Sequence, residues 1–196
     1  MLEFIKKRRF FLLALFLSLV FVWGGAMFVK SADETTLSSL SRLLSAQLKS
    51  GSASVGEQIF SAVVLDMVAI FLIYLLGFSP ISAPMVVGVL GFSSFGAGMN
   101  VGYAYLSFSP SATLYIAVVL APGIALSLLS LCLSAEESLS FSHKIFARAF
   151  KNDAQIINIK KIYKYSLNFL YFSCIIILSG VLDAFLNKIF SNVITL

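Results

Sequence analysis

The sequence predicts an all-α membrane protein: a single bundle of five transmembrane helices over residues 1–196, with the N-terminus inside and the C-terminus outside. The composition leads to this fold class, because 59% of the residues are hydrophobic, only 12% are charged and the mean hydropathy is +0.97. Soluble domains are typically about 45–50% apolar and about 25% charged. The 12 Gly, the 2 Cys and the long apolar runs exclude collagen-like, disulfide-rich and disordered chains.

Five stretches approach the length of about 20 mostly apolar residues that a helix needs to cross a bilayer. The predicted spans are residues 10–29, 59–76, 81–103, 112–133 and 167–189. Gly and Ser lower the hydropathy of the third span, and a re-entrant segment is the alternative there. The first apolar run is longer than the core of a secretory signal peptide, so we expect a retained anchor.

The distribution of Lys and Arg predicts the orientation, because cytoplasmic loops are enriched in these residues. With the N-terminus inside, ten of the 14 basic residues lie in the cytoplasm. These ten are Lys6, Lys7, Arg8, Arg9, Lys144, Arg148, Lys151, Lys160, Lys161 and Lys164. The outer four are Lys30, Arg42, Lys49 and Lys188.

The outer loop, residues 30–57, is predicted to hold an amphipathic helix. Ser31 and Glu34 form a capping-box pattern, and leucines then recur at helical spacing. These candidate partner-binding residues are Leu37, Leu40, Leu44 and Leu48. Their common face either lies on the bilayer or on the bundle itself, or it docks an extracytoplasmic partner.

The inner loop, residues 134–166, is predicted to contain a basic amphipathic helix. Lys144, Arg148 and Lys151 fall on one helical stripe, and Phe146 and Phe150 fall on another. This pattern is typical of a helix at an anionic membrane surface. Because the same basic residues explain the orientation and belong to no recognisable nucleic-acid-binding module, we expect no nucleic-acid partner.

Three polar residues lie within predicted spans: Asp66, Asn100 and Asp183. A carboxylate at the depth of Asp66 is costly, so it must face the bundle interior, be protonated or find hydrogen-bond donors. The expected donors are on the third span: Ser93, Ser94, Asn100 and Tyr103. Asp66 is either a proton or ion relay or a structural hydrogen-bonded residue, and a relay would need a second deep charge. Asp183, near the outer end of its span, is expected to make a local cap or surface contact.

Glycines in the third span are candidates for close helix packing, because they let two helix backbones approach. These candidates are Gly88, Gly91, Gly98 and Gly102, the last two forming a G-x-x-x-G element. Pro80 and Pro84 before this helix predict a kink. Together with Pro122-Gly123 in the fourth span, they leave open a broken-helix substrate site of the kind found in transporters.

The sequence argues against an enzyme. It contains no G-x-x-x-x-G-K-[ST], G-x-S-x-G or H-E-x-x-H motif. The single His143 and the two thiols, Cys132 and Cys174, do not assemble a metal site. We therefore expect no catalytic residues, no metal and no cofactor.

Several short motifs accompany this layout of spans and loops. They are Gly24-Gly25, the glycine-rich third span from Gly88 to Gly102, Pro122-Gly123, Ala135-Glu136 and Leu182-Asp183-Ala184-Phe185. Together, the layout and the motifs resemble the stage II sporulation protein M family. The sequence departs from the family where no proline follows Phe185 and where Gly rather than a polar amide follows Pro122.

The resemblance implies a non-catalytic scaffold in the bacterial cell membrane. Such a scaffold holds the peptidoglycan-cleaving stage II sporulation proteins D and P at the septum during endospore engulfment. The alternative is a small permease, or the membrane subunit of a transporter, that uses Asp66 and the broken helices.

Overall fold

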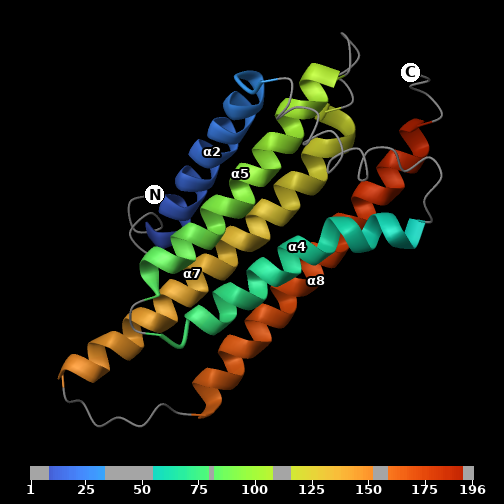
Figure 1. Ribbon diagram of the computed structural model, residues 1–196. Coiled ribbons are helices and arrows are strands. Elements are labelled where there is room, and N and C mark those ends of the chain that lie inside the picture. The colour runs from blue at the N-terminus through green and yellow to red at the C-terminus, as the bar shows by residue number, and fades with distance from the viewer. Residues whose placement is uncertain (1–8, 34–54, 80–81, 108–115, 152–158, 192–196) are drawn as a thin grey trace, which may run out of the picture.

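In the computed structural model, described for residues 9–33, 55–79, 82–107, 116–151 and 159–191, the fold is a bundle of long helices (Figure 1). The α-helices are α2 (Arg9–Lys30), α4 (Val55–Leu76), α5 (Ala83–Ser107), α7 (Ala121–Lys151) and α8 (Ile159–Ser191). A short π-helix, η1 (Ile116–Leu120), directly precedes α7. No strand occurs in the described ranges, so the prediction of an all-helical bundle is confirmed for them.

Four of the helices are long and apolar enough to cross a membrane. Their apolar stretches are Phe10–Lys30, Ala83–Leu106, Val118–Ile145 and Ile159–Ile189. The stretch in α5 is 24 residues long and has a hydropathy of 1.4, the lowest of the four. In α4 the apolar part found among the described residues, Val63–Leu76, is shorter than a span. The structure thus supports a multi-pass membrane protein, and a crossing by α4 stays a prediction.

Two helices differ from the boundaries expected for the fourth and fifth spans. α7 continues to Lys151 and α8 begins at Ile159, so most of the expected inner loop, residues 134–166, is helical and continuous with the spans. At 1.5 Å per residue, the 31 residues of α7 and the 33 residues of α8 reach about 46 and 50 Å. Both lengths exceed a hydrocarbon core of about 30 Å, so these helices extend beyond it at one end or both.

Pro84 does not interrupt the helix expected for the third span. Pro84 is the second residue of α5, where the missing N–H of proline costs no intrahelical hydrogen bond, and the helix continues unbroken to Ser107. Ser82 precedes this first turn, and its carbonyl accepts the N–H of Val86 at 2.8 Å.

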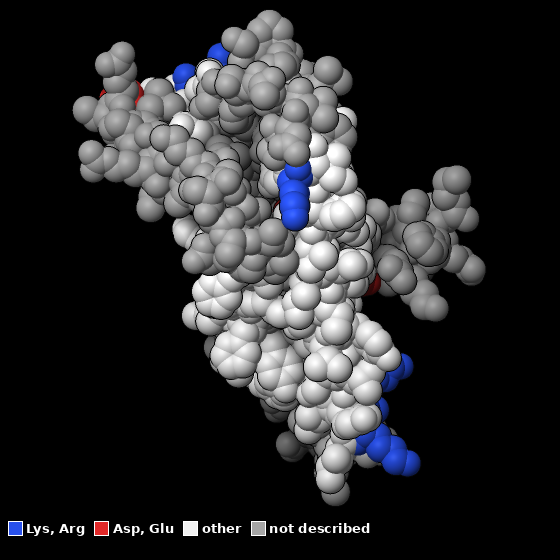
Figure 2. All heavy atoms as spheres, turned by 90° about the vertical axis from the view of Figure 1, so that its right-hand side faces the viewer, with Lys and Arg blue, Asp and Glu red and all other residues white. Residues whose placement is uncertain are grey.

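The helices alternate in direction along the chain, and the start of α2 and the end of α8 lie at opposite ends of the bundle (Figure 1). α2 packs chiefly along α5, α4 packs chiefly against α8, and α7 contacts all the other α-helices. Figure 2 shows Lys and Arg side chains in the upper half and near the lower end of one face, with a mostly white area between them. This distribution suits a bilayer around the middle of the bundle.

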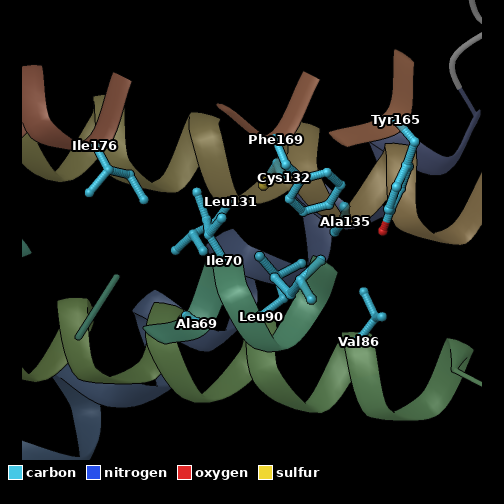
Figure 3. Close-up of a cluster of buried hydrophobic side chains, with 12 residues drawn as sticks. Ala69, Ile70, Val86, Leu90, Leu131, Cys132, Ala135, Tyr165, Phe169 and Ile176 are labelled. Carbon is cyan, nitrogen blue, oxygen red and sulfur yellow. The ribbon is translucent and has the colours of Figure 1, made fainter. Parts of the chain in front are cut away.

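The core lies where α4, α5, α7 and α8 meet, with α2 contributing Ala14 (Figure 3). Ile73, Leu90, Leu131 and Tyr165 are the largest fully buried side chains there. Many large apolar side chains on the outside are exposed, for example Phe16 at 68% and Phe92 at 81%. Outward-facing apolar residues around a more tightly packed interior are expected of helices in lipid.

Candidate functional site

Five residues from three helices form a polar cluster beside the π-helix. Asp66 comes from α4, Gly123 and Ser127 come from α7, and Ser179 and Asp183 come from α8. Asp66 lies in the short apolar stretch of α4, Val63–Leu76. The other four lie in the longer apolar stretches of α7 and α8, Val118–Ile145 and Ile159–Ile189. We refer to them as the acidic-pair site, because Asp66 and Asp183 are its two ionisable members.

The break between η1 and α7 positions one side of this site. Pro122 is the second residue of α7 and lacks an N–H, so it cannot donate a hydrogen bond back to the preceding turn. The turn that it follows is the π-helix Ile116–Leu120. Single π-helical turns in α-helices often occur at functional sites. Near Pro122-Gly123, where the sequence left a break open, the helix changes from the π type of η1 to the α type of α7 without a gap.

Gly123 allows α8 to approach this break. A Cβ atom built on Gly123 would collide with the carboxyl group of Asp183, so only glycine leaves room for that carboxyl against the α7 backbone. One turn earlier on α8, the Ser179 hydroxyl donates a hydrogen bond of 2.7 Å to the Gly123 carbonyl oxygen. Ser179 and Asp183, four residues apart on one helix face, thus both contact the first turn of α7.

Asp66 faces the same region from α4. Its half-buried carboxyl group hydrogen-bonds the side chain of Ser127, one turn after Gly123. The Ser127 hydroxyl is also 3.2 Å from the carbonyl oxygen of Ile124. Sequence reasoning had placed the partner of Asp66 on α5, among Ser93, Ser94, Asn100 and Tyr103. The hydrogen-bond partner that the structure gives is on α7 instead.

The two acids act on each other electrostatically. The oxygen Oδ1 of Asp183 is buried and has no hydrogen-bond partner among the described residues. Asp183 is half-buried against the α7 backbone, which differs from the local surface contact expected for it.

A second polar feature, which sequence reasoning missed, covers the C-terminal end of α4. The last four carbonyl groups of a helix lack intrahelical partners and need others. Here the carbonyl of Ile73 accepts the Ser138 hydroxyl at 2.9 Å, and the carbonyl of Tyr74 accepts the Tyr165 hydroxyl at 2.9 Å. The carbonyls of Leu75 and Leu76 accept backbone N–H groups of the following turn. The end of α4 is thus fully hydrogen-bonded inside the bundle.

The sequence does contain a signal for this feature. Serines recur every four residues along α7, which places them on one helix face. They are Ser130, Ser134, Ser138 and Ser142, all buried. Three of them bond to other segments: Ser130 to the carbonyl of Phe172 at 2.9 Å, Ser138 to that of Ile73, and Ser142 to that of Ser79 at 2.6 Å. The last three serines lie in what was expected to be the inner loop.

The glycines of α5 differ in what they contact. A Cβ atom added to Gly98 would collide with the backbone carbonyl of Val22. A Cβ atom on Gly102 would lie 3.0 Å from the Cα of Ala26, and one on Gly91 would lie 2.9 Å from the ring of Phe21. These three therefore let α5 approach α2. Gly88, expected to pack in the same way, is exposed, and a Cβ there would have nothing within 4 Å.

The remaining candidate residues are spread over the molecule. Asn100 is half-buried on α5, and Lys144 is exposed on α7. Arg148 and Lys151 belong to α7, but their side chains lie outside the described residues. The leucines of the outer loop, Leu37, Leu40, Leu44 and Leu48, also lie outside the described residues. Within the described ranges, no three His, Cys, Asp or Glu side chains are grouped as a metal site would require.

No family model, curated protein or solved structure matches this chain.

Proposed function

We propose that this protein is a non-catalytic membrane scaffold whose helix bundle anchors partner proteins of cell-wall remodelling. Its counterpart, on the resemblance described above, would be the scaffold that the stage II sporulation protein M family provides during endospore engulfment. The partners would then be the stage II sporulation proteins D and P, and the membrane would be the bacterial cell membrane. The N-in, C-out orientation with five crossings is part of this proposal.

The observation that carries the proposal is the contact between Gly123 and Asp183. Each belongs to one of the short motifs on which the resemblance depends, Pro122-Gly123 and Leu182-Asp183-Ala184-Phe185. The two motifs are far apart in the sequence, yet the carboxyl group of one is seated on the glycine of the other. Because the two motifs meet in one contact between α7 and α8, a single structural role, the packing of these helices, accounts for both.

The hydrogen bonds inside the bundle support a scaffold as well. Hydroxyl groups of α7 and α8 bond to main-chain carbonyls of neighbouring segments, as Ser130, Ser138 and Ser179 do. Such bonds between helices hold their relative positions, since an unpaired polar group in hydrocarbon is costly. A protein that presents binding surfaces to partners gains from fixed helix positions.

The test is partner recruitment through the outer leucine face. In the full-length protein, Leu40→Asp combined with Leu44→Asp puts two charges on that face. The matched control is Ser38→Asp combined with Ser45→Asp, which adds the same charges about a quarter-turn away from the leucines. We expect co-purification of wall hydrolases to fall for the leucine variant and to persist for the serine variant, at equal membrane abundance. Unchanged recruitment by the leucine variant would contradict the proposal.

A membrane subunit of a transporter is the second candidate, and the acidic-pair site is the observation that favours it. Ionisable residues inside membrane segments commonly mark ion or proton pathways, and interrupted helices commonly line them. Asp66 and Asp183 lie beside such an interruption. For this function, Asp66→Asn should abolish ion or substrate flux in reconstituted vesicles without changing abundance, whereas Asp33→Asn, at an exposed site after α2, should not.

A further inference from the structure

The first turns of α8 carry lysines on the outside of the bundle. Lys160, Lys161 and Lys164 are all exposed. The opposite side of these turns is buried, because Tyr165 packs into the core. The Tyr165 hydroxyl bonds to the Tyr74 carbonyl near the end of α4. The lysines therefore lie level with that end or beyond it, and Figure 1 shows the start of α8 extending past α4.

The face that carries the lysines continues along α8 as exposed apolar side chains. Tyr171 and Leu178 follow Lys164 by seven and 14 residues, so the three lie on one side of the helix. Tyr171 is 60% exposed and Leu178 is 59% exposed. They lie about 10 and 21 Å from Lys164 along the helix axis. One face thus offers cations at its start and apolar contacts below them, as a phospholipid with its headgroup at the lysines would need.

The lysines also lie at the depth of lipid headgroups. The hydrocarbon core of a bilayer is about 30 Å thick, and the polar layers add about 5–7 Å on each side. Lys164 precedes residue 167, where the predicted span begins, by three residues or about 4.5 Å, and Lys160 precedes it by seven residues or about 10 Å. The flexible stem of a lysine lets its ammonium group reach into the polar layer.

The charge around these lysines favours an anionic ligand. α8 has no acidic residue in its first turn, and the neighbouring α7 carries Lys144, Arg148 and Lys151 toward its end. The acidic residues of α7 are Glu136 and Glu137, which are half-buried rather than exposed. Exposed charge of one sign attracts a ligand of the other sign. The apolar continuation below the lysines favours a lipid over an acidic protein, which would contact the lysines alone.

We propose that the exposed face of α8 from Lys160 to Leu178 is a binding site for an anionic phospholipid. The phosphate and the net negative charge of the headgroup meet the lysines, and the acyl chains lie along Tyr171 and Leu178. In the orientation proposed above, the site faces the cytoplasmic leaflet, which is the anionic one. The site goes beyond the scaffold function and does not depend on it.

Two double variants of the full-length protein separate this site from the overall charge. Lys161→Gln combined with Lys164→Gln removes two charges from the site, and Gln has nearly the helix propensity of Lys. The matched control is Lys30→Gln combined with Lys188→Gln. It has the same net charge, but it loses its charges at the ends of α2 and α8, at the opposite end of the bundle (Figure 1).

The headgroup preference is tested by native mass spectrometry of the purified proteins in detergent. The detergent contains equal amounts of phosphatidylglycerol and phosphatidylcholine with the same acyl chains. We expect the wild type and the control to retain phosphatidylglycerol preferentially. In the Lys161→Gln, Lys164→Gln variant the preference should fall about five-fold for each lysine removed. Equal retention of the two lipids by the wild type, or an equal loss of preference in both variants, would overturn the proposal, as would an unchanged preference in the site variant.

The position of the bound lipid is tested by crosslinking in phosphatidylcholine nanodiscs. A trace of phosphatidylglycerol with a photoactivatable diazirine in one acyl chain is added, and the crosslinked residues are identified by peptide mass spectrometry. Crosslinks should concentrate on α8 between residues 164 and 178, decline in the site variant and persist in the control. Crosslinks spread evenly over α2, α5 and α8 would contradict a site on α8 even if the headgroup preference were confirmed.

Discussion

The hydroxyl group of Ser179 donates a hydrogen bond of 2.7 Å to the carbonyl oxygen of Gly123. It joins α8 to the first turn of α7, directly after the π-helix η1. The bond lies one residue after Pro122, which has no N–H to donate to the preceding turn, so it ties α8 to the point where the helix type changes. The bond also fixes the face of α8 that carries Asp183.

Removing this hydroxyl should loosen the contact between α7 and α8. For Ser179→Ala we expect a loss of about 0.6 kcal/mol, and at most about 1.7 kcal/mol, as measured for hydrogen bonds between membrane helices. This change in the free energy of unfolding is measured by unfolding the purified protein in mixed micelles. Ser173→Ala on the same helix is the control, because the Ser173 hydroxyl bonds to Phe169 of its own helix at 3.0 Å. An equal loss for both variants would contradict a specific role of Ser179.

A methyl group at Gly98 should separate α2 from α5. The added Cβ collides with the carbonyl of Val22, a backbone atom that cannot rotate away. Overpacking of this kind costs about 1–3 kcal/mol, so Gly98→Ala should lower the free energy of unfolding by that amount. Gly96→Ala, on the same helix and with nothing within 4 Å of the new Cβ, should have little effect or a slightly stabilising one. Similar unfolding curves for the two variants would show that α2 and α5 are not in close backbone contact.

Tyr165 should stabilise the fold through its hydroxyl group as well as through its ring. Its hydroxyl donates to the Tyr74 carbonyl at the end of α4, and its ring stacks on Phe141 with centroids 4.4 Å apart. Tyr165→Phe keeps the ring and leaves the carbonyl without that donor, which costs about 1–3 kcal/mol for a buried group. Tyr163→Phe, at a site that is 68% exposed, should leave the unfolding curve unchanged. The prediction fails if Tyr165→Phe is as stable as the wild type.

The predicted orientation can be measured with single cysteines at the helix ends. Ser31→Cys lies just after α2, and Lys160→Cys lies in the first turn of α8. A membrane-impermeant maleimide should label the first in intact cells and the second only after lysis. The parent chain provides the background, since Cys132 is buried and Cys174 lies within an apolar stretch. Labelling of both positions from the same side would contradict the alternating arrangement.

Hydropathy located the helices well where a helix ends at the edge of its apolar run. The expected spans 10–29 and 81–103 lie close to α2 (Arg9–Lys30) and α5 (Ala83–Ser107). It did not locate the ends of α7 and α8, because a helix continues into polar sequence when its propensity and contacts allow. Hydropathy reports where lipid ends, whereas backbone hydrogen bonds determine where a helix ends.

The acidic-pair site shows a different limit of prediction from the sequence. Asp66, Pro122-Gly123 and Asp183 each drew attention as single residues or motifs that are costly or unusual in a membrane segment. Their meeting could not be predicted, since it depends on the rotation of three helices about their axes. Helical spacing orders residues within α7, as for its buried serines, but it gives no relation between α4 and α8.

The pairing of α2 with α5 has a consequence for how the chain is made. Residues 9–30 leave the ribosome well before residues 83–107, and α4, synthesised between them, packs chiefly against the still later α8. Each of these early helices is therefore made before the helix against which it chiefly packs. The strongly apolar α2, with a hydropathy of 2.4, is well suited to that interval. Truncation before residue 159 would therefore leave α4 without the helix against which it chiefly packs.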